Sequence, residues 1–211
     1  MPGTHDFLLF VAAGLLLNIT PGPDMLYIIG RSTAQGVRAG AAAALGIGAG
    51  CVVHVVAAAL GLSAVLAASA TAFTILQYIG ATYLVFVGAS LLLSSRRPPE
   101  SAPAAALPPA TWRQVFLQGF LTNVLNPKVA LFFLAFLPQF IDHDAPGKPL
   151  ALLFLGAVFN VNGTLWNLLV AWSAARIAAG VQSSRLVAWF NRCIGGFFIY
   201  LGIRLAFARQ G

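Results

Sequence analysis

The first apolar run of the chain, residues 7–29, is interrupted by the segment NITPGPD at positions 18–24. Pro21 and Pro23 lack a backbone N–H and flank Gly22, so a regular helix cannot pass through this segment. Carbonyl groups upstream are then left without their helical partners. Inside a membrane, such a break persists only where protein or a wet cavity satisfies the freed groups. The segment therefore predicts a broken helix beside a cavity.

Three polar side chains accompany this break, namely Asn18, Thr20 and Asp24. The amide and the hydroxyl can bond the freed carbonyl groups, and they can also bind a ligand. A carboxylate in an apolar run is costly to bury, which favours a functional role for Asp24 as a proton carrier or as the partner of an ammonium group. The alternative is that Asp24 only caps the following helix at the membrane edge.

A second break is predicted in the apolar run 115–141, where the segment NVLNPK contains Asn123, Asn126, Pro127 and Lys128. The proline again interrupts the helix, and the two asparagines can line a cavity or cap a helix. If Lys128 lies deep in the membrane, its ammonium group would pair with Asp24 or hold the carboxylate of a substrate. If it lies near an interface, it would extend to water instead.

A third polar group, Asn160, Thr164 and Asn167, lies in the apolar run 150–175. Positions four and seven residues apart share one face of a helix, so these side chains form a polar stripe. The stripe is expected to face the interior of a bundle, where it lines a pathway or only bonds neighbouring helices. His54 is alone in its apolar run, which favours a packing residue over a proton relay.

The composition places all of these residues in a membrane protein. Of the 211 residues, 59% are hydrophobic and 8% are charged, against about a quarter charged in soluble domains. This excludes a water-soluble globule. A crossing helix needs about 20 apolar residues, and six runs are long enough. They lie at residues 7–29, 37–67, 71–93, 115–141, 150–175 and 186–208.

The runs are divided equally between two halves, residues 1–93 and 113–211, which are joined by a polar, Pro-rich linker at residues 94–112. The first run of each half is the one broken at proline. Two copies of three helices enter the membrane from opposite sides, so we expect an all-α polytopic bundle of two inverted three-helix repeats, with a binding site between the broken helices. Small-xxx-small spacing further predicts helix packing at Gly36, Gly40, Gly46 and Gly50.

The charge pattern predicts the orientation and excludes several functions. Most of the Lys and Arg residues lie in segments that place the linker in the cytoplasm and both termini outside. The net charge is +7, but the Lys and Arg residues form no basic stripe with interleaved aromatic residues. This argues against nucleic-acid binding. Glu100 is the only glutamate, and no hydrolase, metal-binding or nucleotide-binding motif occurs, so we expect no enzyme, no metal and no cofactor. Transport would then depend on an ion gradient.

At this point the two breaks resemble known signatures. NITPGPD at 18–24, followed by Gly36, Gly40 and Gly46, resembles the amino-terminal signature of the lysine exporter (LysE) family and particularly of its homoserine/threonine exporter (RhtB) branch. Asn126-Pro127-Lys128 followed by FFLAFLPQF at 132–140 is similar to the second signature. The resemblance implies export of amino acids or their derivatives across the bacterial inner membrane, exchange for protons, and a homodimer. It also implies that the matching motif residues form the site.

Two other interpretations remain open at the level of sequence. The first is a passive channel or a cation exporter, although a single membrane carboxylate without a Cys/His pair is a poor divalent-metal site. The second is a purely structural helical membrane module, and it would not need two costly breaks.

Overall fold

The computed structural model describes residues 3–62, 109–142 and 147–177, together with isolated positions within 71–93 and 196–203. The described residues leave out most of the predicted runs 71–93 and 186–208 and most of the linker. The predicted repeat of the two halves therefore also falls outside them. The helices are α1 (Phe7–Ile19), α2 (Pro23–Gln35), α3 (Val37–Ala57) with a π-helical turn (Ala58–Leu62), α6 (Trp112–Val124), α7 (Pro127–Leu131) with π and 3-10 turns (Phe132–Phe136 and Leu137–Phe140), and α8 (Lys148–Ile177).

The first predicted break is confirmed. Helix α1 ends at Ile19 and α2 begins at Pro23, and the two are bent by 52°. Gly22 is extended, with φ −164° and ψ −176°, and Pro23 occupies the first turn of α2, where its missing N–H costs nothing. At the end of α1, the Thr20 hydroxyl and backbone N–H both donate to the Leu16 carbonyl, at 2.7 and 3.0 Å.

The second predicted break is confirmed between α6 and α7, which form a pair bent by 46°. The side chain of Asn126 accepts a hydrogen bond of 3.0 Å from the backbone N–H of Lys128 and so caps α7, with Pro127 in the first turn. At its other end α6 begins with a capping box, in which Thr111 and Gln114 exchange hydrogen bonds.

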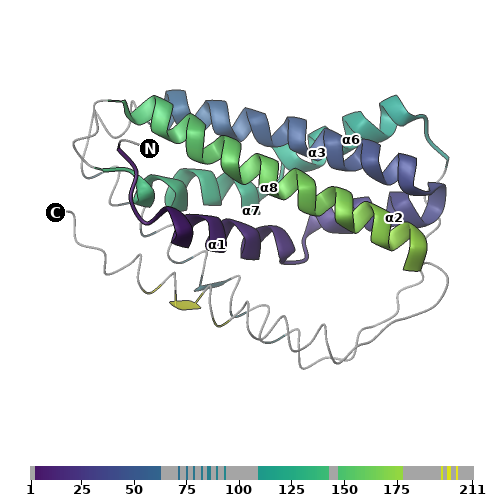
Figure 1. The fold of residues 1–211 in the computed structure, drawn as a ribbon, viewed down its shortest axis with the longest axis horizontal. Coiled ribbons are helices and arrows are strands. Elements are labelled where there is room, and N and C mark those ends of the chain that lie inside the picture. Colours follow the sequence, from purple (N-terminus) through teal and green to yellow (C-terminus); the bar gives the residue numbers. More distant parts are fainter. Residues whose placement is uncertain are drawn as a thin grey trace.

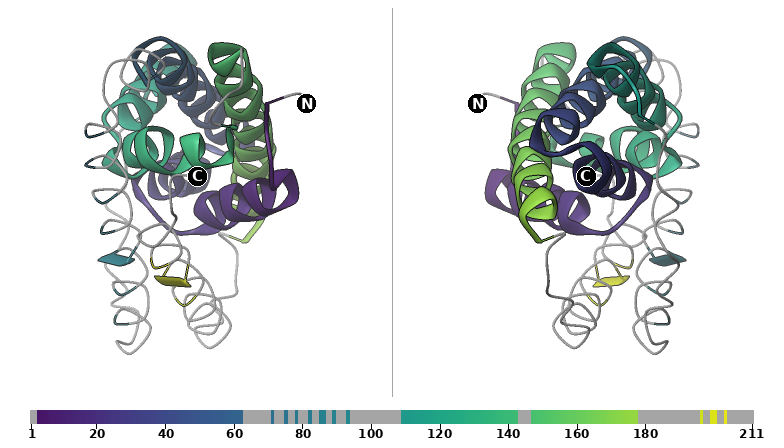
Figure 2. Two further views of the ribbon diagram at one scale, coloured as in Figure 1. Left: turned by 90° about the vertical axis from the view of Figure 1, so that its left-hand side faces the viewer. Right: turned by 90° about the vertical axis from the view of Figure 1, so that its right-hand side faces the viewer.

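Two further helices are long and apolar enough to cross a membrane unbroken. They are Val37–Gly61 and Lys148–Arg176, and the two bent pairs bring the candidate spans to four among the described residues. Figure 1 shows α3 and α8 running along the length of the bundle, with the break between α1 and α2 near its middle. Viewed end on, the four spans surround a common centre (Figure 2).

Glycines fix α3 against α6 at very short range. A Cβ atom at Gly46 would overlap the backbone carbonyl of Phe116, and one at Gly50 would lie 2.6 Å from the carbonyl oxygen of Phe120. On the facing helix, a Cβ at Gly119 would lie 2.6 Å from the carbonyl oxygen of Ala43. Only glycine allows the two backbones to approach so closely.

Of the other two predicted packing glycines, one packs and the other turns the chain. A Cβ at Gly40 would meet the side chains of Ser32 and Ala171. Gly36 has a positive φ of 82° at the junction of α2 and α3, and no heavy atom of the described residues lies within 4 Å of where its Cβ would be. The packing role of Gly36 stays a prediction. The glycine is needed because this turn requires a left-handed φ.

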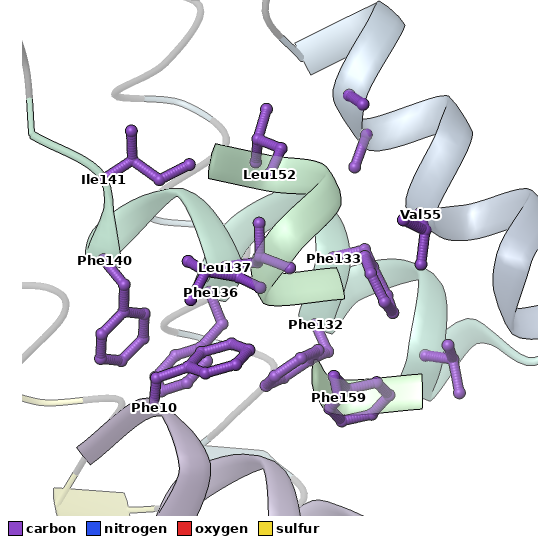
Figure 3. Close-up of a cluster of buried hydrophobic side chains, with 14 of the residues drawn as sticks. Phe10, Val55, Phe132, Phe133, Phe136, Leu137, Phe140, Ile141, Leu152 and Phe159 are labelled. Atoms are coloured by element: carbon purple, nitrogen blue, oxygen red, sulfur yellow. The ribbon is translucent and has the colours of Figure 1, made fainter. Parts of the chain in front are cut away.

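The apolar core is divided between the two ends of the bundle. At one end, Phe10, Phe132, Phe133, Phe136, Phe140 and Phe159 form an aromatic cluster, which Figure 3 shows between α1, α3, α7 and α8. The rings of Phe132 and Phe159 stack at 4.5 Å between centroids. Toward the other end, a smaller cluster consists mostly of alanines with Ile28, Ile47 and Val115.

The charged side chains also differ between the ends. Four arginines lie where α2 meets α3, where α6 begins and where α8 ends, at the right of Figure 1: Arg31, Arg38, Arg113 and Arg176. Here Arg113 lies over the ring of Trp112 and Arg176 over the ring of Trp172, both tryptophans being exposed. The opposite end holds Asp6, Asp142 and Lys148. We call the end that holds the four arginines the arginine-rich end.

Candidate functional site

The two breaks lie side by side on one cavity, as the sequence predicts for a site between broken helices. Its lining includes Asn18, Thr20, Gly22 and Asp24 from the first break, Asn123, Asn126 and Lys128 from the second, and Asn160, Thr164 and Asn167 from α8. Pro21, Pro23 and Pro127 do not line it. Their side chains are exposed, and their effect is to end the helices.

Each break supplies a polar contact to the other. Asn123 Nδ2 donates a hydrogen bond of 2.8 Å to Asp24 Oδ2. In return, Lys128 Nζ donates a hydrogen bond of 2.8 Å to the backbone carbonyl of Thr20, one of the groups that the first break frees from its helix. Asp24 and Lys128 thus form no direct ion pair among the described residues, because each side chain bonds a neutral group of the opposite break.

The second break is held by a separate set of hydrogen bonds. The backbone N–H of Asn126 donates to the carbonyl of Asn123 at 2.9 Å. His54 Nε2 lies 3.0 Å from the same carbonyl oxygen, and its ring stacks on Phe133 with centroids 6.1 Å apart. His54 does not line the cavity and supports the peptide that carries Asn123, which agrees with the packing role expected for it.

Helix α8 forms the third wall, and two glycines bring it close. A Cβ at Gly163 of α8 would lie 3.0–3.2 Å from the carboxamide atoms of Asn18. A Cβ at Gly48 of α3 would lie 2.7 Å from Thr164 Oγ1, which itself lies 3.5 Å from Asn160 Oδ1. Sequence reasoning missed both glycines, because their need for a small residue comes from side chains that are distant in the chain.

Several polar atoms of the cavity have no hydrogen-bond partner among the described residues. They are Asn18 Nδ2, Asp24 Oδ1 and Asn123 Oδ1. A buried polar atom without a partner is costly, so atoms of this kind mark places where a ligand or water binds. The set offers an amide donor together with carboxylate and amide acceptors.

The rest of the lining is apolar, including Leu17, Ile47, Val129 and Phe159. The cavity has a volume of about 30 Å³, which is room for about two water molecules. The site therefore combines a polar end at the breaks with an apolar wall, and in this conformation it is too small for a whole amino acid. Among the described residues, no three His, Cys, Asp or Glu side chains gather to hold a metal ion.

Residues 15–209 match the LysE type translocator family. The chain belongs to this family, which consists of membrane transporters and not of enzymes. Among curated relatives, an uncharacterized membrane protein of Pseudomonas aeruginosa is 31% identical over 98% of this chain and 97% of its own length. A second uncharacterized membrane protein, from Bacillus subtilis, is 27% identical over 95% of this chain and 98% of its own length.

A relative with a named activity covers the same length. The leucine efflux protein of Enterobacter sp. is 27% identical to this LysE-type chain over 97% of it and 96% of the relative. No solved structure matches the chain. The family and the helical architecture together make the protein a multi-pass membrane translocator.

Proposed function

We propose that this LysE-type translocator exports small neutral amino acids from the bacterial cytoplasm across the inner membrane, in exchange for protons. The observation that supports this most directly is the cavity in which the two broken helices bond one another through Asp24–Asn123 and Lys128–Thr20. Broken helices that meet in one cavity are the usual substrate sites of secondary transporters. Relatives named leucine efflux proteins support an amino acid as cargo.

The groups of the cavity match those of a zwitterion. The free Oδ1 of Asp24 can accept a hydrogen bond from the α-ammonium group, and the free Nδ2 of Asn18 can donate to the α-carboxylate. Lys128 uses one of its three donors on Thr20 and has others for the carboxylate. The apolar wall of Leu17, Ile47 and Phe159 suits an aliphatic side chain, so leucine-like substrates are favoured over cationic ones.

Asp24 is the proposed proton-coupling residue. It is the carboxylate that lines the cavity among the described residues, and its second oxygen is held by Asn123. Protonation would remove its charge and weaken its hold on an ammonium group. Proton and substrate would then occupy the carboxylate alternately, which is the requirement for exchange.

The arrangement in the membrane is proposed on the same basis. The arginine-rich end faces the cytoplasm by the positive-inside rule, and its exposed Trp112 and Trp172 suit a membrane interface. We further propose that both termini lie outside and that the helices form two inverted repeats, as the sequence predicts. The signature segments favour the RhtB branch and a homodimer, as their resemblance implies.

Reconstituted protein tests the proposal. Proteoliposomes loaded with radiolabelled leucine should release it faster when a pH gradient drives protons inward, and a protonophore should abolish the acceleration. Loaded threonine, homoserine and lysine rank the substrates in the same assay. Leucine flux that follows only its own concentration gradient would show a passive channel, and no protein-dependent flux of any of the four would contradict amino-acid export.

A further inference from the structure

Helix α2 is bounded at each end by a glycine whose backbone departs from helical geometry. Before it lies the Pro21-Gly22-Pro23 segment, with Gly22 extended. After it lies Gly36, with a φ of 82° and no described atom within 4 Å of where a Cβ would be. Short segments that absorb backbone rotation at both ends of a rigid element are the usual structure of a hinge. Residues Pro23–Gln35 thus form one regular helix between two points where the backbone can turn.

One face of α2 is joined to α6 by a row of polar contacts. Asp24, Tyr27, Arg31 and Gln35 are spaced three or four residues apart and so lie on one side of the helix. Beyond the Asp24–Asn123 bond, the Tyr27 hydroxyl bonds Gln118 Oε1 at 2.9 Å and the carbonyl of Val115 at 3.1 Å. Arg31 Nη2 donates to the same Gln118 oxygen at 2.7 Å.

The last contact of the row lies just before α6 begins. Gln35 donates to the carbonyl of Ala110 at 2.9 Å, and its side-chain oxygen accepts from the Ala110 N–H at 3.3 Å and from Arg31 Nη1 at 3.0 Å. The row therefore runs without interruption from the cavity to the arginine-rich end. We call the contacts of Tyr27, Arg31 and Gln35 with α6 and Ala110 the α2 latch.

The latch differs in kind from the contact between α3 and α6. Those two helices touch through backbone at Gly46, Gly50 and Gly119, which ties them into one unit. In the described part of the chain, the hydrogen bonds from α2 to α6 come from α2 side chains, and water can replace such bonds. Helix α2 also packs on α3 and α8, because a Cβ at Gly40 would meet Ser32 and Ala171, so it would have to slide along these two helices to leave α6. On the side of the opposite end, the cavity borders the phenylalanine cluster through Phe159, and water cannot replace apolar packing in this way.

We propose that α2 is the cytoplasmic gate of the translocator, hinged at Gly22 and Gly36 and closed by the α2 latch on Gln118. The inference rests on the proposed function for the direction of transport. Asp24 links the gate to the site, because a substrate ammonium group that engages its carboxylate competes with Asn123 for it. Loss of the Asp24–Asn123 hydrogen bond would weaken the hold of α2 on α6 and so loosen the neighbouring α2 latch.

Cys51 provides a built-in reporter of gate opening. It lines the cavity, and its thiol is free and buried with 4% of the residue exposed. In a Cys193→Ser background, a small thiol reagent should label Cys51 slowly in inside-out vesicles. Gln118→Ala removes the acceptor shared by Tyr27 and Arg31, and labelling should become about fivefold faster. In right-side-out vesicles the rate should not change.

The controls are polar residues on the same two helices whose hydrogen bonds, within the described part of the chain, stay in their own helix. Thr122 bonds the carbonyl of Gln118, and Thr33 bonds the carbonyls of Ile29 and Gly30. Thr122→Ala and Thr33→Ala should leave the rate unchanged. An unchanged rate in Gln118→Ala, or an equal rise in right-side-out vesicles, would overturn the proposal. This readout needs no substrate, so it is independent of whether leucine is the cargo.

A cross-link tests the gate in a folded protein. With Cys51→Ala and Cys193→Ser, the pair Arg31→Cys and Gln118→Cys can be joined by a short bifunctional thiol reagent. Joining α2 to α6 should abolish transport, and reduction of a disulfide-containing linker should restore it, which shows that the loss is not misfolding. Full transport by the cross-linked protein would show that α2 does not open.

Discussion

Asn123 donates a hydrogen bond of 2.8 Å to the carboxylate of Asp24, although 99 residues separate the two in the chain. The contact joins one broken helix to the other at the edge of the cavity. It also leaves the second carboxylate oxygen, Oδ1, without a partner among the described residues. Asp24 is thus held in place on one side and open to a ligand on the other.

Replacement of Asp24 by asparagine should uncouple transport from the proton gradient. The amide keeps the size of the side chain but cannot exchange a proton or hold an ammonium group by charge. Efflux of leucine driven by a pH gradient should fall about tenfold or more, while the protein remains folded. Asp142→Asn, at an exposed aspartate of the opposite end, is the matched control and should behave as wild type. Undiminished gradient-driven efflux in Asp24→Asn would remove this carboxylate from the mechanism.

Replacement of Lys128 by methionine should impair transport because the Thr20 carbonyl loses its donor and the cavity loses its cation. The expected effect is about a tenfold loss in efflux rate, since a buried acceptor is left unsatisfied and the substrate carboxylate loses a partner. Lys128→Arg should retain part of the activity if charge is what matters. Lys148→Met, at the start of α8, controls for the loss of a lysine elsewhere. Normal kinetics in Lys128→Met would show that the ammonium group only stabilises the break.

The sequence predicts the breaks because proline and glycine act locally. Pro21, Pro23 and Pro127 interrupt a helix whatever surrounds them, and Asp24 is conspicuous in an apolar run for the same reason. The stripe of Asn160 and Thr164 follows from helical spacing alone. These features need no knowledge of which helices are neighbours.

Other features depend on contacts that no local pattern encodes. Lys128 donates to the backbone carbonyl of Thr20. Every residue type carries a backbone carbonyl, so the sequence does not indicate which one lacks its helical partner. In the sequence, Arg31 resembles a charged residue of a loop between membrane spans. In the structure it is buried, with 4% exposed, because Gln118 and Tyr27 accept hydrogen bonds from its guanidinium group. Gly36 fits the small-xxx-small spacing of Gly40, and only its φ shows that it turns the chain.

A methyl group added at Gly163 should reduce the capacity of the site without unfolding the protein. Its Cβ would press on the carboxamide of Asn18 at 3.0–3.2 Å, and alanine is otherwise favoured over glycine in a helix by about 1 kcal/mol. We expect KM for leucine to rise about tenfold at an unchanged melting temperature, because the added group lies where the ligand would bind. Gly61→Ala, where no atom of the described residues lies within 4 Å of the new Cβ, is the control. An unchanged KM in Gly163→Ala would show that Asn18 is not at the substrate site.

Alanine at Gly46 should act on the fold instead of the site. The new Cβ would overlap the backbone carbonyl of Phe116, and backbone in the middle of α6 cannot move aside as a side chain can. Overpacking of this kind costs about 1–3 kcal/mol, so the melting temperature in detergent should fall clearly below that of Gly61→Ala. Any protein that does fold should keep its KM for leucine, because Gly46 does not line the cavity. A stable Gly46→Ala protein would mean that α3 and α6 can separate, and the close backbone contact would then no longer distinguish this pair from α2 and α6.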